Sequence, residues 1–313
     1  MLVLEAIAAL LAFIFGLFVL IYCSDKAVKH SVIIASAWKI PPILIGLVFV
    51  SIGTDLPEII NSIIASWTGH GDINVGDSLG SAFTQITLIL GLLALLVKDF
   101  KVDKKEILII GVCEILSLIL VASVVEKGYI SRTNGFFLVI SWILLMLIVR
   151  TLTKKDNVYE KKGEKKIHHF IIAILGFLGV AAGSYILVES IITISTLFGV
   201  SEYFISFFIA AIGTSLPELA VDLNALRKRQ YEIAIGDIIG SSIVDATLSI
   251  GIGPMIFSNV LSSGETAFLT AIYAVFASLI VIATLYIRGK VERKTGILFI
   301  IVYLVSYVIF LHA

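Results

Sequence analysis

The chain has 313 residues, of which 59% are hydrophobic and 15% are charged. Soluble globular proteins average about 45–50% apolar and about 25% charged residues, so this composition excludes a soluble globular chain and indicates an integral membrane protein. The 23 basic residues balance the 23 acidic residues, and a chain without net charge offers no basic surface for nucleic acid.

Ten segments are apolar over the roughly 20 residues that a membrane-spanning helix needs. The second and the seventh are too long for a straight span, and both contain Gly-Thr-x-Leu-Pro near the middle, where proline removes a helical hydrogen bond. We therefore predict an all-α membrane protein of ten transmembrane helices, with helices 2 and 7 broken at the midplane of the bilayer. The predicted spans lie at about 3–22, 31–67, 76–97, 104–126, 132–152, 167–189, 200–227, 235–257, 266–287 and 294–311.

The basic residues lie mainly on one side of these spans. When alternate loops are assigned to opposite faces, every Lys and Arg except Lys127 and Arg132 falls on the same face. The positive-inside rule places that face in the cytoplasm. We predict a multi-pass protein of the cell membrane with both termini outside and with the Lys-rich linker 153–166 in the cytoplasm. This linker separates two five-helix halves, 1–152 and 167–313.

A sequence repeat with a shift of 160 residues relates the two halves. Gly-Thr-Asp-Leu-Pro-Glu at 53–58 recurs as Gly-Thr-Ser-Leu-Pro-Glu at 213–218, and the Gly-Asp and Gly-Ser pairs of 76–81 recur at 236–241. Because five helices are an odd number, the second copy enters the bilayer from the opposite face, and we predict inverted repeats. Inverted repeats with interrupted helices at matching positions indicate a transporter whose site lies between the halves.

Acidic and hydroxyl side chains gather around the two breaks. Glu58 lies one helical turn after Thr54, and Glu218 one turn after Thr214, so each pair shares a helical face. The following helices carry polar residues at one-turn spacing, namely Asp77, Ser81, Gln85, Asp237, Ser241, Asp245 and Ser249. An ionised carboxylate at the bilayer centre needs a partner, and no Lys or Arg lies near that depth in these segments. Such oxygen ligands suit Ca²⁺ or Na⁺, so we expect a transported cation to balance the carboxylates.

Other functions fit the same residues less well. A single Gly-Thr-x-x-Pro is more often a helix kink than a site, but here it occurs twice, each time with Glu. An intramembrane aspartyl protease needs Gly-x-Gly-Asp, and Asn74 and Ala234 occupy the first glycine position in the two copies. A passive channel would conduct without counter-transport. We therefore expect a transporter and not an enzyme.

With its paired motifs at 53–58 and 76–91 and their copies 160 residues later, the whole chain resembles the cation/calcium exchanger superfamily, in particular the prokaryotic sodium/calcium exchangers. The resemblance implies antiport of Na⁺ against Ca²⁺ by alternating access, with helices one and six sliding across the rest. It implies no cofactor and no obligate protein partner, with the bilayer as surroundings. It also implies that Glu58 and Glu218 are central Ca²⁺ ligands. Further oxygen ligands would come from Thr54, Thr214, Ser215, Ser81, Ser241, Gln85, Asp245 and the carbonyl groups of Ser51 and Ala211.

Some positions depart from the family pattern and change the charge of the site. Asp55 replaces a serine, Gln85 replaces Asn or Asp, and Asp77 and Asp237 stand where Asn is typical. Carboxylates this crowded should share protons. Asp77 and Asp237 are therefore either structural substitutes for Asn or part of proton coupling, and Ca²⁺/H⁺ exchange and K⁺-dependent exchange stay open as alternatives.

Overall fold

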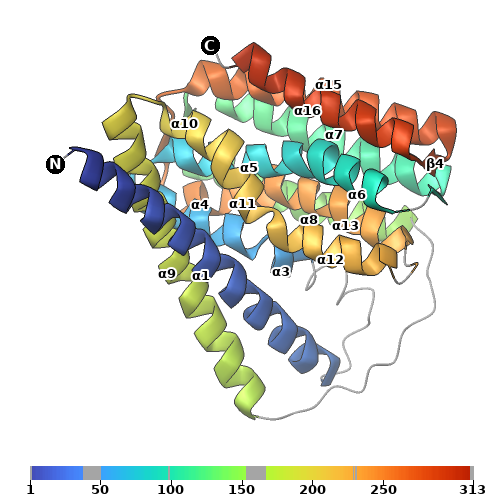
Figure 1. Ribbon diagram of the computed structural model, residues 1–313. Coiled ribbons are helices and arrows are strands. Elements are labelled where there is room, and N and C mark those ends of the chain that lie inside the picture. The colour runs from blue at the N-terminus through green and yellow to red at the C-terminus, as the bar shows by residue number, and fades with distance from the viewer. Residues whose placement is uncertain are drawn as a thin grey trace.

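The computed structural model describes residues 2–37, 51–97, 99–152, 167–227, 229 and 231–310. Long helices make up nearly all of this part (Figure 1). Within it, nine helices are long and apolar enough to cross a membrane. The predicted second span, 31–67, includes residues 38–50, which lie outside the described residues, as does the predicted linker 153–166. The prediction of an all-α multi-pass membrane protein is confirmed.

The first half contains six long helical segments, one short helical turn, one π-helical segment and two strands of two residues each. In chain order they are α1 (Leu2–Ala37), α3 (Ser51–Thr54), α4 (Leu56–Thr68), α5 (Gly71–Thr84), η2 (Gln85–Ile89), α6 (Leu90–Leu96), β1 (Phe100–Lys101), α7 (Lys104–Val125), β2 (Tyr129–Ile130) and α8 (Arg132–Leu152).

The second half follows the same order of elements. It consists of α9 (Ile167–Phe198), α10 (Glu202–Ile205), η3 (Ser206–Ala210), α11 (Ala211–Thr214), α12 (Leu216–Arg227), α13 (Tyr231–Val244), η4 (Asp245–Ser249), α14 (Ile250–Ile256), β3 (Asn259–Val260), α15 (Gly264–Arg288), β4 (Lys290–Val291) and α16 (Arg293–Phe310).

Two predicted spans end too early. Helix α1 continues to Ala37, so residues 31–37, which the prediction gave to the second helix, belong to the first. Helix α9 continues past the predicted end at residue 189 to Phe198, and the chain leaves it at Gly199, which has φ of +65°. The prediction took charged residues as span ends, but Lys, Glu and Arg are good helix formers. The helices therefore outrun the apolar stretch.

The two Gly-Thr-x-Leu-Pro segments are interrupted in the same way. Asp55 separates α3 from α4 with φ/ψ of −79°/7°, and Ser215 separates α11 from α12 with −84°/7°. Pro57 and Pro217 follow in the first turn of the next helix, where the missing N–H of proline leaves no bond unmade. The breaks lie where the sequence predicts them, and their depth in a bilayer stays a prediction.

Equivalent helices of the two halves run antiparallel. Helices α1 and α9 lie side by side and reach away from the other helices at one end (Figure 1). Gly16 faces Leu187, whereas Ala27, further along α1, faces Gly176, earlier in α9. The strands agree with this relation, since β1 pairs antiparallel with β4 and β2 with β3, and a shift of 160 residues exchanges the two pairs. This is the geometry that inverted repeats require.

Candidate functional site

The predicted site residues lie in the interior of the helix bundle. They come from the two broken segments and from the helices α5–η2 and α13–η4 that follow them. The side chain of Ser51 lies outside the described part. Every other predicted side chain is at most 7% exposed, and these are Thr54, Asp55, Glu58, Asp77, Ser81, Gln85, Ala211, Thr214, Ser215, Glu218, Asp237, Ser241 and Asp245.

A chain of polar contacts connects the two halves at the breaks. The Ser81 hydroxyl donates to Glu58 Oε1 at 3.1 Å, and it lies 3.2 Å from the Thr214 hydroxyl. The Thr214 hydroxyl donates to Asp77 Oδ1 at 3.1 Å. The carbonyl oxygen of Ala211 lies 3.5 Å from Ser81 Oγ and 3.4 Å from Thr214 Oγ1. Oxygen atoms from α4, α5 and α11 therefore converge on one point.

A second contact joins the two π-helical segments. Gln85, the first residue of η2, donates through Nε2 to Asp245 Oδ2 at 3.1 Å, and Asp245 is the first residue of η4. Ser249 donates to the other carboxylate oxygen of Asp245, also at 3.1 Å. π-Helical turns occur frequently at functional sites. Here both segments place a predicted ligand at the contact between the halves.

The glutamates carry buried oxygens that the protein leaves unpaired. Within the described part of the chain, Glu58 Oε2 and both carboxylate oxygens of Glu218 have no hydrogen-bond partner. The carboxylates of Glu58, Glu218 and Asp55 are close enough to repel one another, and no Lys or Arg is among the buried residues that the structure describes. A buried carboxylate without a counter-charge is costly. The site therefore needs cations or protons to neutralise it.

The chemistry of the donors suits a cation that is not held by carboxylates alone. Among the described residues, no three Asp, Glu, His or Cys side chains are grouped so that they could hold a metal ion. A cation at Glu58 and Glu218 would draw its remaining ligands from hydroxyl, amide and carbonyl oxygens. These are the oxygen ligands of Ca²⁺ sites in proteins.

Asn61 is part of the site and was not predicted. Its Nδ2 donates to Asp77 Oδ2 at 2.6 Å, while Thr214 donates to Asp77 Oδ1. Asp77 therefore accepts hydrogen bonds on both oxygens, which corrects the prediction that it could act as a structural substitute for Asn, because an Asn would also offer a donor. The spacing held the signal, since Asn61 lies three residues after Glu58 and shares its helical face.

Two further buried carboxyl groups lie outside the predicted set. Glu114 in α7 is fully buried, and its Oε1 accepts from Ser278 at 2.7 Å and from Ser242 at 3.3 Å. Neither serine is a predicted ligand, so Glu114 holds α7, α13 and α15 together. Asp222 in α12 is also fully buried. It lies one helical turn after Glu218, a spacing that would have revealed it in the sequence.

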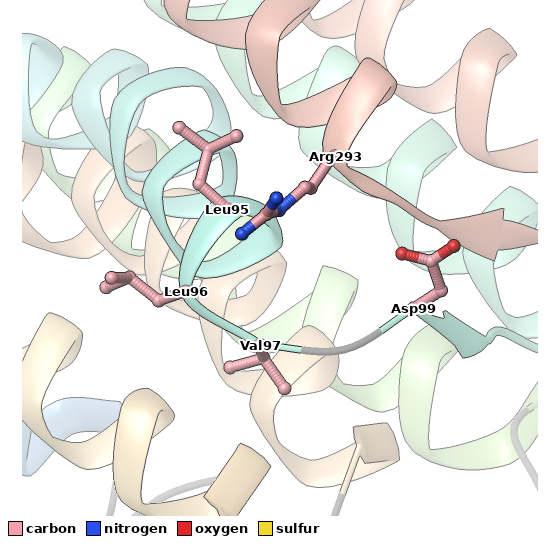
Figure 2. A pocket seen from close by; sticks show the side chains of 5 residues that line it. All are labelled: Leu95, Leu96, Val97, Asp99 and Arg293. Atoms are coloured by element: carbon pink, nitrogen blue, oxygen red, sulfur yellow. The ribbon is translucent and has the colours of Figure 1, made fainter.

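A surface pocket of about 470 Å³ lies apart from the predicted ligands. Figure 2 shows Arg293 at the start of α16 above the end of α6, with Asp99 on the other side. The remaining lining residues are Leu95, Leu96 and Val97. None of the predicted ligands lines it, so this open hollow is not the candidate site.

The comparisons with known proteins agree with this arrangement. Residues 8–151 and 168–312 match the family model described as "Sodium/calcium exchanger protein". The chain belongs to the sodium/calcium exchanger family. This family consists of membrane transporters that exchange Na⁺ and Ca²⁺, so the chain is a cation antiporter by family and the expectation of a transporter is confirmed.

Individual members of the sodium/calcium exchanger family match over most of the chain. Inner membrane protein YrbG of Escherichia coli K12 is 33% identical over 258 residues, which cover 78% of each chain. Sodium/calcium exchanger MaX1 of Methanosarcina acetivorans is 25% identical, covering 96% of this chain and 97% of that protein. A solved structure of the sodium-calcium exchanger NCX_Mj superposes with a TM-score of 0.65 at 29% identity, covering 96% of this chain and 97% of that one.

Proposed function

We propose that the chain exchanges Na⁺ for Ca²⁺ across the cell membrane by alternating access, with Glu58 and Glu218 as shared ligands of the transported cations. The observation that carries this proposal is the contact chain from Glu58 through Ser81 to Thr214. It brings the motif of one half against the motif of the other in a buried site, which is where an inverted-repeat transporter binds its substrate.

Competition for one set of oxygens would couple the two ions. Na⁺ and Ca²⁺ both take hard oxygen ligands, so binding of one displaces the other. When the site is occluded and empty, its carboxylates are buried without a counter-charge, and that state is costly. The switch between outward-open and inward-open states is therefore easy only with cations bound, which prevents an uncoupled leak.

The remaining predicted ligands fit this site by their chemistry. The hydroxyl groups of Ser81 and Thr214 and the carbonyl group of Ala211 already lie together. Further oxygens are proposed from Thr54, Ser215, Ser241, Asp245, Gln85, Asp55, Asp77, Asp237 and the carbonyl group of Ser51.

The movement is proposed for the helix pair α1 and α9. Their contact uses small residues, with Gly16, Gly176 and Gly183 against the backbone of the opposite helix, and close smooth packing of this kind lets helices slide. The domains are proposed as a first repeat 1–152, a cytoplasmic linker 153–166 and a second repeat 167–313, with both termini outside.

Properties of the relatives support the choice of ions. MaX1 is named a sodium/calcium exchanger. The NCX_Mj structures concern extracellular ion exchange and binding-site occlusion, in protein soaked with Na⁺, Sr²⁺ or Ca²⁺. Sr²⁺ is a larger relative of Ca²⁺ with the same preference for oxygen ligands.

Exchange of Ca²⁺ for H⁺ is the second candidate. Asp55 is a carboxylate where the family pattern has serine, and it lies within repulsive distance of Glu58 and Glu218. An additional carboxyl group in the site could carry the exchanged proton. K⁺-dependent exchange is the third candidate, because other relatives are named sodium/potassium/calcium exchangers.

Calcium uptake into proteoliposomes separates these candidates. The purified protein is reconstituted, and uptake of radioactive Ca²⁺ is measured under an imposed gradient of Na⁺ alone, of H⁺ alone, or of Na⁺ with and without K⁺. Na⁺/Ca²⁺ exchange predicts uptake driven by Na⁺ without any need for K⁺. Uptake driven only by the H⁺ gradient would contradict it and support Ca²⁺/H⁺ exchange.

A further inference from the structure

Asp222 is a buried acidic residue outside the proposed ligand set. Its side chain is 0% exposed, and within the described part of the chain neither of its oxygens has a hydrogen-bond donor. It follows Glu218 by one helical turn, so both residues lie on one face of α12. Asp222 is nearer to the end of α12 at Arg227, and therefore lies between the central ligands and the loop that joins α12 to α13.

The neighbour of this carboxyl group is another carboxyl group. The side chain of Asp222 lies beside that of Asp237 in α13. Asp237 is in turn close enough to Asp55 and Glu218 for their charges to repel. Asp237 thus stands between the central ligands and Asp222. Gly236, the residue before it, lines a small cavity of about 20 Å³ together with Tyr231 and Ile235, which is room for about one water molecule.

The first half of the chain has no such pair. The position equivalent to Asp222 is Ser62, whose hydroxyl accepts a hydrogen bond from the Gly253 N–H at 3.1 Å. The equivalent of Asp237 is Asp77, and Asn61 donates to it. A serine and an asparagine therefore satisfy the structural needs of this place in the fold. Two adjacent carboxylates repel each other, so their presence in the second half needs a function that the first half does not have.

We propose that Asp222 and Asp237 form a second cation-binding site, which loads the transported cation between the central ligands and the α12–α13 end of the bundle. Two carboxylates supply only part of the six to eight oxygens that Ca²⁺ takes. The cation at this site therefore keeps some of its water, binds weakly and moves on quickly. The identity of the cation, Ca²⁺ or Na⁺, rests on the proposed function.

Equilibrium binding tests the site without requiring transport. The double variant Glu58→Gln/Glu218→Gln disables the central site, and binding of radioactive Ca²⁺ and Na⁺ to the purified protein is then measured with and without Asp222→Asn. The proposal expects weak residual cation binding in the double variant, weakened further by at least about tenfold when Asp222→Asn is added. Glu114→Gln, added to the same background, is the matched control, because it also neutralises a fully buried carboxyl group.

The outcomes separate clearly. Residual binding that Asp222→Asn removes and Glu114→Gln leaves intact supports the proposal. Equal cation binding with and without Asp222→Asn, or none in the double variant, overturns it, and the two carboxyl groups then share a proton. Asp222→Ser, which copies Ser62 of the first half, gives a second variant should the Asn form unfold, and thermal unfolding curves check both.

Transport from each side adds a directional readout. In the wild-type background, Asp222→Asn should raise the apparent KM for the cation on the α12–α13 side about fivefold or more and leave the KM on the opposite side and kcat unchanged. Equal changes on both sides contradict a loading role. If the wild-type protein shows no Na⁺/Ca²⁺ exchange, the proposed function fails, but the binding measurement still decides on this site.

Discussion

Gln85 and Asp245 occupy the same position in the two halves, 160 residues apart, and they are hydrogen bonded to each other at 3.1 Å. A second pair with the same separation also meets, since the Ser242 hydroxyl donates to the Ala82 carbonyl oxygen at 3.3 Å. Under a twofold relation, equivalent residues can touch only close to the axis. The segments α5–η2 and α13–η4 therefore cross there, and the candidate site is built around this crossing.

The Gln85–Asp245 contact should stabilise the empty protein. In Gln85→Leu, Asp245 Oδ2 loses its donor in the protein interior, which costs about 1–3 kcal/mol. We expect a lower Tm in detergent without Ca²⁺, with part of the loss recovered when Ca²⁺ is added and supplies a counter-charge. Thr87→Val is the control, because Thr87 bonds only to the Phe83 carbonyl of its own helix. An unchanged Tm for Gln85→Leu would show that the contact carries no stability.

The contact between α1 and α9 depends on the absence of a side chain at Gly176. A Cβ at this position would lie 2.8 Å from the Ala27 nitrogen, so Gly176→Ala should push the two helices apart. We predict a lower Tm and slower exchange, measured on the same preparation. Leu178→Ala is the control, since Leu178 is 62% exposed in the protein. A Gly176→Ala variant as stable and active as Leu178→Ala would refute the close packing.

Acidification should loosen the same helix pair at its other end. The Nδ1 atoms of His30 and His169 lie 2.7 Å apart, so one ring must donate and the other accept. Burial, and then the positive charges of His169, His168, Lys29 and Lys26, lower the pKa of His30. The folded protein therefore binds fewer protons than the unfolded chain near the ordinary histidine value of about 6.5.

The stability from His30 is thus present above that value and is lost as the pH falls through the lowered pKa. Between about pH 8 and about pH 5, the Tm of the wild-type protein should fall more than that of His30→Gln, in which position 30 no longer titrates. Parallel Tm curves for the two proteins would contradict this assignment.

The sequence predicts the architecture well because its signals are local. Apolar stretches mark the spans, and Pro57 and Pro217 mark the interruptions. The shift of 160 residues also matches the elements closely, since α5 begins at Gly71 and α13 at Tyr231. These features follow from hydropathy and from the missing N–H of proline, both of which can be read without tertiary structure.

The features that were missed depend on tertiary contacts. Charged residues near the end of α1 suggested an earlier helix end, although packing against α9 carries the helix to Ala37. The π-helical segments have no sequence signature of their own. The pairing of Asn61 with Asp77 and the burial of Asp222 require knowing which helices are neighbours, and the one-turn spacing from the two glutamates only suggests it.

The central claim is that Glu58 and Glu218, one from each half, bind the transported cation together. The most direct test is Na⁺-driven uptake of radioactive Ca²⁺ in proteoliposomes containing Glu58→Gln or Glu218→Gln, with Glu114→Gln as the control for loss of a buried carboxyl group. The account predicts that each motif variant folds but loses exchange by at least about 100-fold, while Glu114→Gln transports. Wild-type exchange in either motif variant would contradict it.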